Sequence, residues 1–109
     1  MRYAVRVLSR PEVGAGFALA GLETVEAGGD AQARARLQEL MRVPEIGVVL
    51  MEAGFYDRLP EDWRRDLGRR PLPMVVPFPE PSWAGGPDKA DAYIIELLRQ
   101  VIGYRVRLK

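Results

Sequence analysis

The 109-residue sequence contains no cysteine and no histidine. Without cysteine the chain forms no disulfide, and it offers neither a thiol nucleophile nor a thiolate metal site. Without histidine it also lacks the commonest metal ligand and the commonest general base. These two absences exclude every triad, dyad or zinc site that uses either residue, so we expect no catalytic, cofactor-binding or metal-binding residues.

An excess of one charge and long apolar runs are missing as well. The 16 Lys and Arg residues nearly balance the 15 Asp and Glu residues, and the formal net charge is +1. Such a balance supplies no strong field that would attract nucleic acid or an anionic membrane. The first apolar run is short and is interrupted by Arg6, and no stretch reaches the roughly 18–20 residues of a membrane span. We therefore expect a cytoplasmic protein that binds no nucleic acid and does not insert into the membrane.

Four segments of the chain have the composition and length of β-strands. The run Ile46–Met51 is almost entirely apolar, which is typical of a central parallel strand covered on both faces. Prolines in the segment Leu72–Phe78 favour an edge strand, because proline has no N–H to donate. The four segments are residues 3–8, 22–26, 46–51 and 72–78.

Helix signals separate these strands. One helix is expected within Pro11–Gly21, a second begins with Asp30 as its N-cap, and a short third covers Glu61–Leu67. This order requires right-handed parallel crossovers. We therefore predict an α/β fold: a small doubly wound, mainly parallel four-stranded sheet of receiver or flavodoxin type, with a C-terminal helix and a short tail. The expected core positions of the helices are Val13, Phe17, Ala20, Ala33, Leu37, Leu40, Met41, Trp63 and Leu67.

The whole chain is expected to form a single domain. Residues 1–80 make up its α/β core, residues 81–87 form a proline- and glycine-rich loop, and residues 88–109 contribute the last helix and the tail. The concentration of proline and glycine indicates an irregular loop and not a second domain.

Motifs for ligand binding are present only in part. Gly14–Leu19 begins like a dinucleotide fingerprint, but Leu19 occupies the third glycine position and the glycines fall inside the predicted helix. Close packing of that helix is the alternative interpretation. A phospho-receiver needs an Asp at the end of the third strand and an acidic pair after the first. Here Glu52 and Ser9-Arg10 occupy those places, and we interpret Glu52 as a solvated loop residue.

Residues 58–70 mix arginines with acidic side chains. We expect a solvated helix face with local ion pairs at i, i+3 and i, i+4 spacing. Trp63 and Trp83 lie in charged and proline-rich settings and are candidate anchors for a partner, with packing on the sheet as the alternative for Trp63. The charged residues are Arg58, Glu61, Asp62, Arg64, Arg65, Asp66, Arg69 and Arg70.

The last predicted helix, Asp88–Ile102, has more apolar surface than one sheet face covers. At about 100° per residue its apolar positions spread over roughly 200°, whereas packing on one face requires about 100°. Ile95 and Ile102 remain on a flank that needs cover from the tail, from a neighbouring helix or from another protein. Our hypothesis is that a helical partner covers this flank.

Several segments together resemble a known family. Residues Gly16–Leu22 match the pattern Gly-Phe-x-Leu-Ala-Gly, the stretch Pro71–Pro79 surrounds the fourth strand, and residues 93–103 read Tyr-Ile-x-x-Leu-Leu-x-x-x-Ile-Gly. With the first strand, these signatures span nearly the whole chain, which resembles the F subunit of the V-type and A-type rotary ATPases, a small protein of the central stalk. Members of that family often carry an acidic residue after the first strand, where this chain has Ser9-Arg10. We interpret that difference as a surface position.

The resemblance implies a non-catalytic rotor subunit that couples ATP hydrolysis or synthesis to proton or sodium transport, without a cofactor of its own. It implies docking on the coiled-coil rotor protein of the central stalk, the D subunit, with the catalytic A/B headpiece and the socket protein of the membrane ring as further candidate partners. It also places the protein on the cytoplasmic side, peripheral to the membrane through the ATPase complex. The alternative is a stand-alone receiver-like signalling or ligand-binding module that lacks the phospho-acceptor Asp.

Two sets of residues acquire roles from this resemblance. Gly16, Ala20 and Gly21 would let the first helix approach the sheet closely while Phe17 fills the core. The expected contacts with the rotor lie in the last helix and the tail, at Ile95, Arg99, Ile102, Tyr104, Val106 and Leu108.

Overall fold

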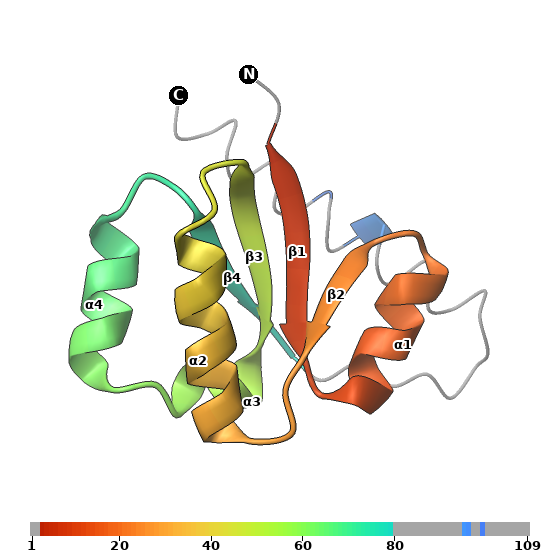
Figure 1. The fold of residues 1–109 in the computed structure, drawn as a ribbon, viewed down its shortest axis with the longest axis horizontal. Helices are drawn as coiled ribbons and strands as arrows, with labels where there is room; N and C mark the ends of the chain where they lie inside the picture. Colours follow the sequence, from red (N-terminus) through yellow and green to blue (C-terminus); the bar gives the residue numbers. More distant parts are fainter. Residues whose placement is uncertain (1–2, 80–94, 97–98, 100–109) are drawn as a thin grey trace.

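The computed structural model describes residues 3–79, 95, 96 and 99. Strands and helices alternate along the first of these stretches, as the sequence predicts (Figure 1). In chain order they are β1 (Ala4–Ser9), α1 (Pro11–Leu19), β2 (Glu23–Glu26), α2 (Asp30–Met41), β3 (Ile46–Glu52), α3 (Ala53–Asp57), α4 (Glu61–Arg69) and β4 (Met74–Phe78).

The four strands form one parallel sheet in the order β2-β1-β3-β4. The apolar strand β3 is central and the proline-containing strand β4 lies at an edge, so both predictions for these strands are confirmed. At the other edge, Arg6 of β1 lies directly opposite Glu23 of β2, and their side chains form an ion pair at 3.1 Å. The predicted α/β fold is confirmed.

Helices cover both faces of the sheet. Successive strand residues point to opposite faces, so Val7 belongs to one apolar cluster and Leu8 to the other. Helix α1 covers one face, where Phe17 packs edge to face against Phe78 with ring centroids 5.0 Å apart. Helices α2, α3 and α4 cover the opposite face and supply its larger cluster. The buried residues of the larger cluster are Leu8, Ala27, Ala33, Leu37, Leu40, Ile46, Val49, Met51, Phe55, Leu59 and Leu67.

The pairing of β1 with β3 is irregular at its beginning. Ala4 pairs with Ile46 but Val5 pairs with Val48, so Gly47 is an extra residue in β3. A Cβ atom on Gly47 would lie 2.5 Å from the Cβ of Tyr3. Glycine is therefore needed here because the Tyr3 side chain occupies the space that a side chain on Gly47 would take.

The first helix is closed by Gly21, as the sequence predicts. Gly21 has a φ of +89°, and the amides of Gly21 and Leu22 donate to the carbonyls of Ala18 and Phe17, which together form a Schellman motif. Ala20 and Gly21 are exposed, so the predicted close approach through these two residues is wrong. Gly14 lies against the sheet, where an added Cβ would be 3.1 Å from the Ser9 hydroxyl. Gly16 of the predicted set is buried as well, so the glycine-containing helix packs closely through Gly14 and Gly16 and not through Ala20 or Gly21.

Two other elements also differ from the sequence prediction. The N-cap of α2 is Gly29, and Asp30 is the first helical residue. Helix α3 is absent from the prediction, because its five residues are too few for a helical pattern to be recognised; its Phe55 is nevertheless buried in the larger cluster. Trp63 and Met41 are half-buried and pack against that cluster, which supports the interpretation that Trp63 rests on the sheet side of α4.

The loop 81–87, most of the predicted helix 88–102 and the tail lie outside the described residues. Ile95, Glu96 and Arg99 are described and have helical backbone. Across the described part of the chain, no helix is long and apolar enough to cross a membrane.

Candidate functional site

The carboxyl ends of β1 and β3 meet where the direction of chain winding reverses. From β1 the chain moves to β2 at one edge and then crosses back to β3 on the other side. In open α/β sheets this position is the usual place for a ligand. The side chains at this end therefore show directly what chemistry the fold offers.

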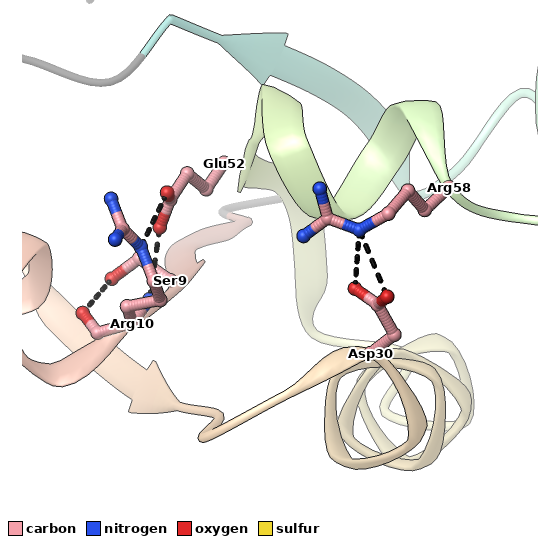
Figure 2. Close-up of polar contacts among 5 residues, drawn as sticks. All are labelled: Ser9, Arg10, Asp30, Glu52 and Arg58. Carbon is pink, nitrogen blue, oxygen red and sulfur yellow. Dashed lines mark hydrogen bonds and ion pairs between the residues drawn. The ribbon is translucent and has the colours of Figure 1, made fainter.

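An arginine and a glutamate occupy the crevice between the two strand ends. Arg10 follows β1, and its Nε donates to Glu52 Oε2 at 2.8 Å while its backbone N–H donates to Oε1 at 3.0 Å (Figure 2). The Glu52 side chain is only 6% exposed and that of Arg10 is 36% exposed. A buried carboxylate is stable only with such partners, because both of its oxygens have lost water.

A second ion pair lies beside the first. Arg58, which follows α3, donates through Nε to both carboxylate oxygens of Asp30, at 2.8 and 2.9 Å (Figure 2). The Arg58 guanidinium also lies 5.9 Å from the centre of the Phe55 ring. This pair joins the first turn of α2 to the end of α3, and at the same place the Gln32 side chain accepts a hydrogen bond from the Gly28 amide. Charged side chains thus tie together the loops around the crevice.

The interpretation of Glu52 as a solvated loop residue is wrong. It is the last residue of β3, is buried, and is paired with Arg10. Ser9 is fully buried as well, so Ser9-Arg10 is not simply a surface position. A receiver site holds a divalent cation with several carboxylates, whereas here an arginine faces a single glutamate. Among the described residues, no group of three or more acidic side chains is placed to hold a metal ion.

A signal for this pair is present in the sequence, although it depends on two distant positions. Opposite charges lie at the ends of two strands that are neighbours in a parallel sheet, and the carboxyl ends of such strands lie at the same edge. Neither Arg10 nor Glu52, taken alone, indicates that the two residues form an ion pair. The strand order, which links them, becomes available only with the fold.

The structure describes two of the six predicted rotor contacts. Ile95 is 57% exposed, so the described part of the chain leaves more than half of this residue uncovered. Arg99 is also exposed and forms an ion pair with Glu96 at 3.4 Å, three residues earlier in the sequence. The other four predicted contacts, Ile102, Tyr104, Val106 and Leu108, lie outside the described residues.

The chain is similar in sequence to small subunits of ATP synthases. Residues 5–94 match the family model described as ATP synthase (F/14-kDa) subunit. The V-type ATP synthase F subunits of two Thermus thermophilus strains are each 28% identical to the chain over 102 residues. Each alignment covers 94% of this chain and 98% of the relative.

The chain is also similar to a solved structure. The crystal structure of the V-type ATP synthase F subunit from Archaeoglobus fulgidus superposes with a TM-score of 0.65 at 24% sequence identity, covering 72% of this chain and 99% of the other. At that identity the likeness establishes the shared fold, and the sequence matches carry the relationship.

Proposed function

The chain belongs to the ATP synthase (F/14-kDa) subunit family, and on this premise we propose that it is a central-stalk subunit that turns with the rotor of a V-type ATP synthase. It contributes no active site and couples ATP hydrolysis or synthesis on the headpiece to proton or sodium transport in the membrane. The observation that carries the proposal is the family match, which spans residues 5–94.

The state of the crevice supports a role without ligand chemistry. The Arg10 side chain and backbone N–H occupy both oxygens of Glu52 at the position where this topology usually binds a ligand. The residues in the crevice therefore stabilise the fold. This favours a subunit that acts through contacts with other proteins over a stand-alone signalling module.

We propose that the rotor contact lies in the C-terminal segment. Its partner is the coiled-coil rotor subunit, and the contacts are Ile95 and Arg99 together with Ile102, Tyr104, Val106 and Leu108. A side chain as apolar as Ile95 gains free energy when a partner removes its exposed surface from water. The protein works on the cytoplasmic side and reaches the membrane only through the complex.

Co-purification with the coiled-coil rotor subunit tests this proposal. The full chain is expected to co-purify with the rotor subunit in a one-to-one ratio. A chain that ends before Asp88 is expected to be absent from the purified complex. A point variant refines the test. Ile95→Lys should raise the dissociation constant of the complex roughly tenfold, because a charged lysine replaces apolar surface that the rotor subunit would bury.

Leu19 provides the matched control, since it is an exposed large apolar residue, 80% exposed, at the end of α1 and outside the proposed interface. Leu19→Lys should bind like the natural chain. Equal binding by the full and truncated chains contradicts the C-terminal assignment, and binding by neither contradicts the central-stalk role.

A further inference from the structure

A groove separates α2 from α4 on the face of the sheet opposite α1. Figure 1 shows the two helices side by side and running in the same direction. Between them lies a cavity of about 160 Å³. It is lined by Gln38 and Met41 of α2 and by Trp63, Asp66, Leu67 and Arg70 in and just after α4.

The lining has the composition of a protein-binding surface. Leu67 is buried in the core below, while Trp63 and Met41 are half-buried and present apolar surface to the groove. Arg70 is exposed at the end of the groove. Tryptophan and arginine are among the residue types that most often dominate the free energy of protein association.

The charges along α4 form no ion pairs with one another, contrary to the local pairs expected from the sequence. Throughout the stretch 3–79, the ion pairs of the structure include Arg58 with Asp30 but none between the charged side chains of α4. Charges of opposite sign also lie at its two ends. Glu61 and Asp62 lie in the first turn, and Arg69 and Arg70 lie at the end.

Helix α2 strengthens the positive end of the groove. Arg42 directly follows α2, is exposed and makes no ion pair with the rest of the described chain. Arg42 follows the last residue of α2, and Arg69 and Arg70 lie at the end of α4. Because the two helices run in the same direction (Figure 1), these three arginines lie at the same end. Acidic side chains therefore flank one end of the groove and arginines the other, and the lining between them combines the apolar Met41, Trp63 and Leu67 with the polar Gln38 and Asp66.

We propose that this groove binds an amphipathic helix of another subunit, which runs antiparallel to α2 and α4. Helices commonly carry acidic residues in the first turn and basic residues in the last, because these charges complement the helix dipole. In the antiparallel orientation the acidic first turn of the partner meets Arg42, Arg69 and Arg70, and its basic last turn meets Glu61 and Asp62. An apolar stripe between them contacts Trp63 and Met41.

The length of α4 limits how long a helix the groove can contact. Helix α4 has nine residues and is therefore about 13 Å long. A partner helix of about three turns would match it. Other chains are available to supply such a helix, because members of this family are subunits of an assembly. The described residues that line the groove all belong to the segment 38–70, so the proposal does not depend on how the C-terminal segment binds.

Photo-crosslinking in the assembled ATP synthase complex tests the proposal. p-Benzoylphenylalanine is introduced at Trp63 or at Arg70, with Glu12 on α1, across the sheet, as the control position. The two groove positions should capture the same helical segment of another subunit. Residues captured from position 70 should precede those captured from position 63 by about seven positions, since the two sites are about 10 Å apart along α4.

A charge variant provides a second measurement on the same complex. In the chain carrying the crosslinker at position 63, Arg70→Glu should lower the crosslinked fraction about tenfold, because it opposes the acidic turn of the partner. Arg65→Glu is the matched control: it reverses an exposed arginine of α4 that does not line the groove, and it should leave the fraction unchanged.

Several outcomes overturn the proposal. These are the opposite order of captured residues, capture of a second copy of this chain, capture of a segment without the expected charges, and no capture in a complex that retains the subunit. Equal effects of the two charge variants also overturn it. The rotor contact is tested separately, by the loss of the C-terminally truncated subunit from the complex. Failure of the groove proposal is therefore distinguishable from failure of the proposed rotor contact.

Discussion

A single arginine satisfies both oxygens of the buried Glu52 carboxylate, one through its side chain and one through its backbone N–H. Burial of a carboxylate costs several kcal/mol unless such bonds replace its hydration. The pair links the end of β3 to the start of α1, two segments 42 residues apart in the chain. The pair therefore holds the end of β3 against the start of α1, and its loss should destabilise the fold.

Glu52→Gln should lower the free energy of unfolding by about 1–3 kcal/mol, because the amide leaves the buried end of the Arg10 pair without its charged acceptor. Urea denaturation followed by circular dichroism measures the change. Glu39→Gln is the control, since Glu39 is paired with Arg36 at 3.3 Å in an exposed position. It should cost less than about 0.5 kcal/mol. Equal losses for the two variants would contradict a special role for Glu52.

At the scale of elements, two glycines in regular structure have opposite surroundings. Gly68 lies near the end of α4 with nothing within 4 Å of an added Cβ, whereas Gly47 in β3 is covered by Tyr3. The first is a helix position without a steric reason for glycine. The second permits the irregular pairing of β1 with β3.

The same substitution should therefore change stability in opposite directions at these two sites. Gly68→Ala should raise the free energy of unfolding by about 0.5–1 kcal/mol, because alanine restricts the unfolded chain and favours the helix. Gly47→Ala should lower it by about 1–3 kcal/mol, because the new methyl group overlaps Tyr3. The midpoints of urea denaturation curves measure the change in stability of each variant. A stabilised Gly47→Ala variant would show that Tyr3 moves aside freely and that the bulge needs no glycine.

The main elements and their order can be predicted from the sequence because the relevant signals are local. The apolar run 46–51 and the prolines of the fourth strand are sufficient to place β3 at the centre and β4 at an edge. The five-residue helix α3 escapes prediction because it is shorter than two helical turns. The Arg10–Glu52 pair depends on which strands are neighbours. Within the stretch 3–79, the charged side chains of α4 do not form ion pairs with one another. Their spacing in the sequence does not determine this, because it depends on the positions of the side chains.

At the scale of the whole molecule, we propose two sets of residues as contacts for partners. One is the C-terminal segment with the exposed Ile95, and the other is the groove between α2 and α4. At the carboxyl end of the sheet, Arg10 pairs with Glu52 and Arg58 pairs with Asp30. We propose that a small subunit built in this way transmits force in the rotor through contacts at its surface.

Rotation of the subunit itself tests this central claim most directly. The chain contains no cysteine, so a single Glu12→Cys substitution on the exposed side of α1 gives a unique attachment point for a bead before the subunit is returned to the complex. With the catalytic headpiece fixed to a surface, addition of ATP should make the bead rotate in steps. A bead that stays still while the same complexes hydrolyse ATP and their coiled-coil rotor subunit turns would contradict the account.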